Sequence, residues 1–258
     1  GLVVEVVSVG VMSYAGLLPC VVSAFFGESV ASLLGLSAEK YSIVGQTAFQ
    51  LPSVGVILAL GILCALLSVG FCKLLHETEH LLRRLFPNAF VRILAASFVY
   101  IGLTLLFQTK DYCGTSSNLI VRALAGETRY EAFFLKALLT AITLGGGFKG
   151  GEIIPTLCVG ATFGCAFGKL VGFAPGLCAA CAMMAMFCGV TNCPISALLL
   201  GLELCGTENM GFFAIVIAVS YVLSGYSSLY VSQRVLHSKT ETELTAQGEE
   251  KTLDKSDG

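Results

Sequence analysis

Long apolar runs separated by short polar connections dominate this chain. The runs at residues 10–35, 53–75 and 93–107 approach or exceed the roughly 20 residues that a helix needs to cross a bilayer. Pro19 interrupts the first run, which membrane helices tolerate. Residues 1–8 are also apolar and are expected to be the tail of a helix. The pattern predicts an all-α protein that crosses a membrane several times.

From residue 116 onward the apolar runs become shorter, and glycine or proline separates them. Several are too short to cross a bilayer straight. Broken helices at membrane depth are found where they are buried in protein or line a polar path, which favours the core of a channel or transporter over a simple bundle. The expected helices are 116–125, 131–144, 153–171, 176–190, 194–205, 210–224 and 226–237.

The polar connections predict an orientation for the chain. The connection at residues 73–92 carries one lysine and three arginines, and the positive-inside rule places it in the cytoplasm. The loops at 36–52 and 108–115 are then expected to be external. Residues 238–258 are polar and without apolar periodicity, which predicts a disordered cytoplasmic tail.

Composition agrees with a membrane location. Hydrophobic residues make up 55% of the chain and charged residues 12%, whereas soluble proteins are about one quarter charged. We therefore expect an integral, multi-pass protein, in the cell membrane, with lipid as its surroundings. The formal net charge of −2 gives no sign of a nucleic-acid partner.

Most of the 11 cysteines lie inside apolar runs, where a free cysteine behaves as a small buried hydrophobe. Cys178 and Cys181 form a CxxC pair, but no second pair or histidine follows at metal-ligand spacing. We expect structural cysteines and no metal cofactor. The seven for which burial is expected are Cys64, Cys72, Cys158, Cys165, Cys178, Cys181 and Cys188.

The stretch from Gly145 to Pro155 contains five glycines before Glu152 and is followed by an apolar helical run. Glycine lets the backbone bend tightly and approach a ligand without a Cβ in the way. The first amides of a helix lack internal partners and carry the positive end of the helix dipole. We predict an anion site at Gly151, Glu152 and Ile153, where backbone amides bind and the carboxylate turns away.

Two glutamates lie at the ends of apolar runs, Glu5 in Leu2–Val6 and Glu203 in Leu200–Leu204. Acids near membrane depth are costly and are functional candidates by default. The alternative, of equal weight, is that each carboxylate binds backbone amides at a helix end and holds the architecture. The similar settings are also what two related halves of an inverted repeat would show.

A second function class rests on His76-Glu-Thr-Glu-His80, which matches HExxH. On a helix, His76 and His80 share a face and Glu77 is placed as a general base, as in a membrane-embedded zinc metalloprotease. A catalytic zinc needs a third protein ligand, and the only other histidine is His237. A secondary transporter with a different inverted repeat is a third, weaker candidate.

Four motifs together resemble the CLC family of chloride channels and proton-coupled chloride transporters. Gly150-Gly-Glu-Ile-Ile-Pro155, followed by Leu157 and Gly160-Ala161, is similar to the family's GxFxP anion filter, with Ile153 in place of the usual phenylalanine. The resemblance covers nearly everything from residue 1 to about 236. The other motifs are Gly114–Ile120, Asn192–Cys205 with its terminal glutamate, and Gly225–Tyr230.

The resemblance implies a chloride or other small-anion pathway built from broken, tilted helices, and no enzyme. The amides of Glu152 and Ile153 and the hydroxyl of Tyr226 would hold the anion, although Tyr226 in isolation is typical of an interfacial aromatic belt. A homodimer is implied, with contacts from residues 10–35 and 194–224. Residues 1–35 would end the first repeat half, and 36–237 would form the complete second half.

Departures from the family pattern bear on mechanism. Motifs similar to GSGIP and GREGP, which carry the filter serine and the gating glutamate, are absent, so we expect further sequence upstream. We accordingly expect that these 258 residues do not conduct alone. Val6 stands where proton-coupled members have a glutamate, which favours a passive channel over a Cl⁻/H⁺ antiporter.

Overall fold

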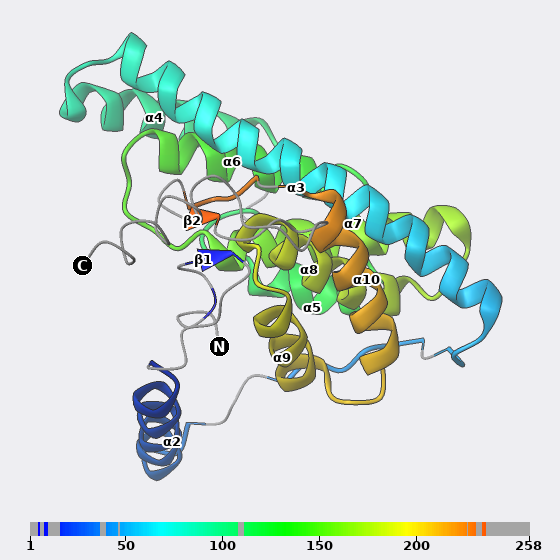
Figure 1. Ribbon diagram of the computed structural model, residues 1–258. Helices are drawn as coiled ribbons and strands as arrows, with labels where there is room; N and C mark the ends of the chain where they lie inside the picture. The colour runs from blue at the N-terminus through cyan, green and yellow to red at the C-terminus, as the bar shows by residue number, and fades with distance from the viewer. Residues whose placement is uncertain are drawn as a thin grey trace, which may run out of the picture.

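The computed structural model describes residues 5, 8–9, 16–36, 40–45, 47–107, 111–225, 227–230 and 234–235. The regular secondary structure of these residues is helical apart from two strands of two residues each (Figure 1). The all-α prediction is confirmed in this sense. The helices are α2 (Leu17–Leu33), α3 (Leu51–Leu85), α4 (Ala89–Leu106), α5 (Ser117–Leu124), α6 (Ala132–Gly145), α7 (Ile153–Val171), α8 (Pro175–Thr191), α9 (Pro194–Cys205) and α10 (Met210–Leu223).

The predicted boundaries of the second part agree closely with these helices. The predictions for 153–171 and 194–205 coincide with α7 and α9. Both helices have strong start signals, a glycine-rich turn before α7 and a proline in the first turn of α9. The short runs are therefore separate helices, as expected.

The helix α3 is longer than predicted. It has 35 residues and runs ten residues past the expected end at residue 75, through the connection that we expected to be cytoplasmic. No glycine or proline interrupts this part of the sequence until Pro87, and the ion pair between Arg83 and Glu79, 2.6 Å long, supports the last turns. The charged residues mark the end of the apolar segment, while the helix itself continues.

Three predictions near the chain ends are wrong in part. Pro19 does not break α2, because it lies in the first turn, where the missing N–H had no partner to lose. In the predicted helix 226–237, Arg234 and Val235 form β2 (Arg234–Val235), which pairs in parallel with β1 (Ser8–Val9). The ladder satisfies backbone groups of both segments, and Ser8 is therefore not the tail of a helix. Residues 1–4, 6–7, 10–15, 226, 231–233 and 236–258 of these predictions lie outside the described residues.

The core lies where α7 packs on α8, near the middle of the molecule in Figure 1. Residues 176–191 of α8 are all buried. Gly160, Gly164 and Gly168 on α7 face α8 at spacings of four, the small-residue pattern that lets membrane helices approach closely. A Cβ at Gly164 would collide with the backbone of Cys178, so the closeness depends on glycine.

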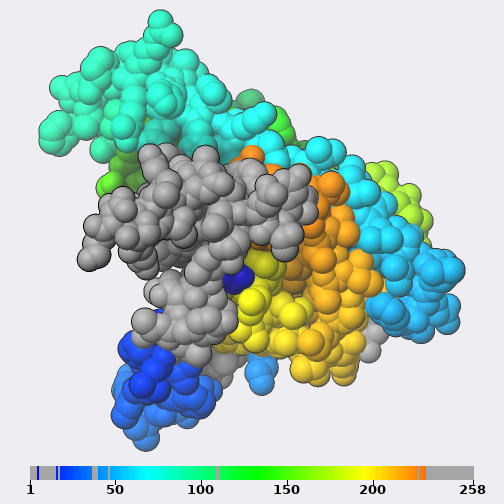
Figure 2. All heavy atoms as spheres, in the orientation of Figure 1, coloured from blue at the N-terminus to red at the C-terminus, as the bar shows by residue number. Residues whose placement is uncertain are grey.

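Within the described part of the chain, three helices, α3, α4 and α7, are long and apolar enough to span a membrane. Outward-facing apolar side chains cover α4, of whose described residues only Ala96 is buried. The described side chains of α2 are also mostly exposed, and Figure 2 shows this helix at the lower left edge of the molecule. Such surfaces suit contact with lipid or with other protein.

All seven cysteines for which burial was expected are buried, which confirms that prediction. Each of the 11 cysteines is a free thiol. The buried cysteines of the core pack among apolar side chains such as Leu177 and Met183. They act as small apolar groups in the α7–α8 interface and its surroundings.

The two acidic candidates have different surroundings. Glu5 is buried and caps α9 from a distance: its carboxylate accepts bonds from Ile195 N (3.1 Å), Ser196 N (2.8 Å) and Ser196 Oγ (2.7 Å). The architectural alternative therefore describes Glu5, whose negative charge also suits the helix N-terminus. Glu203 lies in the last turn of α9 with its side chain exposed.

Replacing Gly164 by alanine should push α7 away from α8. We expect Gly164→Ala to destabilise the fold by about 1–3 kcal/mol, the usual cost of overpacking. Thermal unfolding with a thiol-reactive fluorogenic dye measures this, because unfolding exposes the buried cysteines. Gly102→Ala on α4, where no atom lies within 4 Å of an added Cβ, is the matched control. Equal midpoints for the two variants would contradict the packing argument.

Replacing Glu5 by glutamine should uncap α9. The glutamine side chain keeps one acceptor oxygen, but its NH₂ group is a donor that faces the donors at the start of α9. We therefore expect the unfolding free energy to fall by about 1–3 kcal/mol. The same dye assay measures it, with Glu28→Gln on the exposed face of α2 as the control. An unchanged midpoint for Glu5→Gln would show that the cap contributes nothing to stability.

Candidate functional site

The glycine loop, defined here as residues 146–151, joins the end of α6 to the start of α7. Gly147 adopts φ +98°, a conformation that favours glycine, and this allows the chain to reverse after α6. Two backbone bonds close the helix end, from Gly147 N to Leu144 O (3.0 Å) and from Phe148 N to Thr143 O (3.3 Å). The remaining glycines then lead the backbone to the N-terminus of α7.

The first amides of α7 have no hydrogen-bond acceptor among the described residues. The first recorded backbone bond of the helix runs from Thr156 N to Glu152 O (3.2 Å), and the Glu152 side chain makes no capping bond. Among the hydrogen bonds of the described residues, none has an amide of Gly150 through Ile154 as its donor. Such amides carry partial positive charge and need an acceptor from solvent, protein or ligand.

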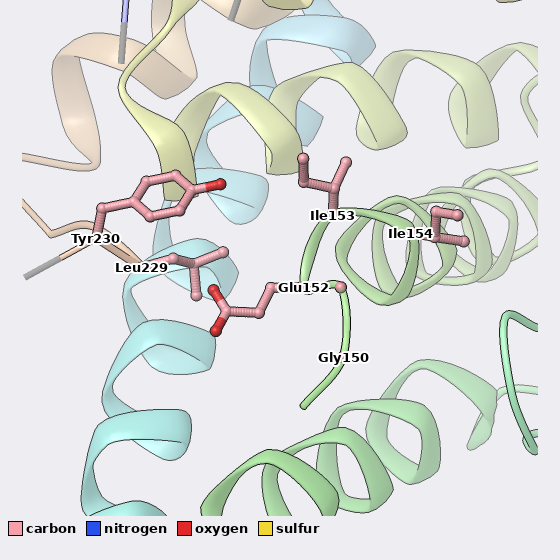
Figure 3. Close-up of a pocket in the computed structure, with 7 residues that line it drawn as sticks. Gly150, Glu152, Ile153, Ile154, Leu229 and Tyr230 are labelled. Atoms are coloured by element: carbon pink, nitrogen blue, oxygen red, sulfur yellow. The ribbon is translucent and has the colours of Figure 1, made fainter. Parts of the chain in front are cut away.

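These amides belong to residues that line a cavity of about 940 Å³. Figure 3 shows the ring of Tyr230 pointing its hydroxyl toward Ile153 at the start of α7. Leu229 lies beside Tyr230 and above the Glu152 side chain in the same view. The full lining is Gly150, Gly151, Glu152, Ile153, Ile154, Leu229 and Tyr230.

The segment 227–230 is anchored on the end of α8, which holds Tyr230 opposite the glycine loop. Leu229 N donates to Val190 O (2.9 Å), and Asn192 Nδ2 donates to Ser227 O (3.2 Å). Asn192 itself ends α8 in a left-handed conformation with φ +59°. One wall of the cavity is therefore attached to the core helix and the other is the start of α7.

The Glu152 carboxylate points toward α3 in Figure 3. Glu152 precedes α7 and lies outside the helices long enough to cross a membrane. Partial burial raises the pKa of its carboxyl above the usual range, while His76 on α3 acts to lower that pKa and Glu79 to raise it. The carboxylate is thus near the helix that carries the HExxH sequence.

A second cavity, of about 530 Å³, is bounded by α4, α6, residues 112–115 and the glycine loop. It shares Gly150, Gly151 and Ile154 with the first cavity, so the end of the loop borders both. Its lining includes Lys136 of α6. The loop is therefore the partition between two hollow regions of the molecule.

Lys136 is a buried cation, with only 3% of its surface exposed. Its ammonium donates to Tyr112 O (3.1 Å), Gly114 O (2.6 Å) and Ser116 Oγ (2.9 Å). These three acceptors are uncharged, and no ion pair to Lys136 is found among the described residues. The positive charge is therefore hydrogen-bonded but not neutralised, and it favours anions in the second cavity.

Three of the four predicted site residues, Gly151, Glu152 and Ile153, line one cavity together. Tyr226 lies outside the described residues, so its place in the site stays a prediction. Sequence reasoning missed Tyr230, which is the described tyrosine of this cavity. The signal was present in the same motif, where a second tyrosine follows Tyr226 by four residues.

The zinc alternative receives no support from the geometry. His76 is half-buried and His80 is exposed on α3. Over the part of the chain that the structure describes, no three His, Cys, Asp or Glu side chains gather as a metal site. This region of α3 instead packs on Gly145 at the end of α6.

Comparison with known proteins gives a consistent result. Residues 2–225 match the family described as voltage gated chloride channel. A chloride/fluoride channel protein of Pseudomonas syringae pv. tomato is 31% identical over 241 residues, which are 91% of this chain and 53% of that protein. An uncharacterized protein of Methanocaldococcus jannaschii is 35% identical over 92 residues, 35% of this chain and 22% of that protein.

Among solved structures, a CLC-type fluoride/proton antiporter superposes with a TM-score of 0.85 at 27% identity. The likeness covers 90% of this chain and 59% of the antiporter chain. The chain thus spans little more than half the length of the first relative and of this structure. With its match over residues 2–225, the chain belongs to the voltage gated chloride channel (CLC) family, a family of integral multi-pass membrane proteins that move anions.

Proposed function

We propose that this chain forms one side of a transmembrane pathway for chloride or fluoride, with an anion site at the start of α7. The observation that carries the proposal is the set of unpaired amides from Gly150 to Ile154 in residues that line one cavity with Tyr230. Of these, we assign the amides of Glu152 and Ile153 to the anion, together with the hydroxyl of Tyr230. Such donors replace the water shell of a small anion.

Partial charges suit transport better than a full charge at this position. An anion held by amides and a hydroxyl regains part of its hydration energy, yet it is free to leave again. The fixed dipoles of α7 need no rearrangement when the anion arrives, because the helix is anchored along its length against α8. The apolar side chains of Ile153 and Leu229, of which Leu229 is buried, line the same cavity and lower the local polarity, which strengthens the binding.

The second cavity supports a continuous route. An anion leaving the α7 amides on the other side of the glycine loop would enter a space whose lining includes the uncompensated cation Lys136. A cavity with positive potential raises the local concentration of anions. The two cavities therefore form consecutive parts of the proposed pathway, with Gly150, Gly151 and Ile154 between them.

The names of the relatives fit an anion substrate, since one is a chloride/fluoride channel protein and another a fluoride/proton antiporter. We extend the proposal to a homodimer in the cell membrane, supported by the exposed apolar residues of α2 and α9. Val6 favours a channel over an antiporter. Measuring proton flux together with anion flux distinguishes the two, because an antiporter moves protons with the anion.

The hydroxyl of Tyr230 should contribute to anion binding. We expect Tyr230→Phe, which removes that oxygen alone, to weaken the apparent affinity for the transported anion roughly tenfold, the worth of one hydrogen bond to a charged group. Anion efflux from liposomes containing the intact protein, measured with an ion-selective electrode over a range of anion concentrations, gives this value. Tyr130→Phe, at an exposed tyrosine, is the control.

The same measurement on Tyr226→Phe tests the tyrosine that sequence reasoning favoured. A loss of affinity in Tyr226→Phe but not in Tyr230→Phe would assign the hydroxyl to Tyr226 and contradict our choice. If neither variant differs from the Tyr130→Phe control, the amides would bind without help from a tyrosine. No selective anion efflux from the unmodified protein would overturn the proposed function as a whole.

A further inference from the structure

The site proposed above is made of backbone, so its geometry depends on what holds the glycine loop in place. Among the described residues, backbone bonds with a donor in the loop come from Gly146, Gly147 and Phe148 alone, all of them at the α6 end. The donors that face the cavity lie beyond these bonds, from Gly150 onward. Contacts with other helices must therefore fix the path of the loop.

One such contact comes from α3. Gly145, the last residue of α6, lies so close to the backbone of α3 that an added Cβ would be 3.1 Å from Glu79 N and 3.2 Å from the carbonyl carbon of Thr78. This close approach uses the segment of α3 that extends beyond its apolar part. It fixes the point at which the loop begins.

The other contact comes from α4, at the half-buried Arg92. Its Nε donates to Gly146 O across 54 residues of sequence, at 3.4 Å. A Cβ at the next residue, Gly147, would lie 3.4 Å from one terminal nitrogen of the same guanidinium. Ala96, one turn further along α4, would collide with a Cβ on Gly146. Arg92 and Ala96 thus lie in close contact with two successive glycines of the loop.

We propose that Arg92 is a positioning residue for the anion site, holding the glycine loop against α4 so that the amides at the start of α7 keep their binding geometry. This inference rests on the proposed function. An arginine suits the task because its planar fork offers an Nε donor in a fixed direction, which a flexible lysine lacks. Arg92 belongs to the basic connection at 73–92, and its positive charge attracts anions whether or not it positions the loop. The experiment therefore includes a variant that removes only a nearby positive charge.

The experiment measures concentration-dependent anion efflux from liposomes containing the intact protein, together with thermal unfolding. We expect Arg92→Gln to raise the apparent KM for the anion about 3–10-fold, with an unfolding midpoint close to that of the unmodified protein. Arg92→Lys, which retains the charge and loses the Nε donor, should raise KM by at least threefold. The matched control is Arg84→Gln, which removes an exposed positive charge from the same connection and should leave KM unchanged.

Each outcome decides a different question. If Arg92→Lys matches the unmodified protein while Arg92→Gln does not, attraction by charge explains the effect and positioning is wrong. If both Arg92 variants keep an unchanged KM while Tyr230→Phe loses affinity, the positioning role fails and the proposed function stands. If Arg92→Gln does not fold, Arg92→Lys alone carries the test, and an unchanged KM in that variant overturns the proposal.

Discussion

An amide N–H without an acceptor is costly wherever water is excluded, and the start of α7 presents several of them. At two other helix starts a side chain supplies the acceptor: Glu5 caps α9 from nearly two hundred residues away, and Asn88 caps α4 locally. At Glu152 the side chain makes no such bond. This uncapped helix start lines a cavity together with Tyr230, which is why an anion is a fitting partner.

Close approach between backbones then determines much of the surrounding structure. Glycines on α7 let it pack against α8, which fixes the helix whose dipole faces the cavity. In the same way, Gly145 at the end of α6 packs closely on the backbone of α3, and Gly146 and Gly147 pack closely on side chains of α4. The number of glycines around residues 145–168 therefore reflects both a binding site and the contacts that hold it.

The sequence predicts the helices of the second part well because glycine and proline mark their ends, as at Ile153 and Pro194. It predicts poorly what depends on distant partners. The charged end of α3 looked like a connection, since nothing local shows that it packs on Gly145. The pairing of Ser8 with Arg234 and the contact of Arg92 with Gly146 also join segments without any shared pattern. The choice between Tyr226 and Tyr230 depends on the path of the chain after α10, which periodicity does not determine.

The most direct test is to locate the anion itself. Bromide has an anomalous X-ray signal, and a crystal of the intact protein grown in bromide would show where the ion binds. The account predicts an anomalous peak within hydrogen-bonding distance of the amides of Glu152 and Ile153, in the cavity lined by Tyr230. Bromide ordered elsewhere in the protein, with no peak at the start of α7, would contradict it.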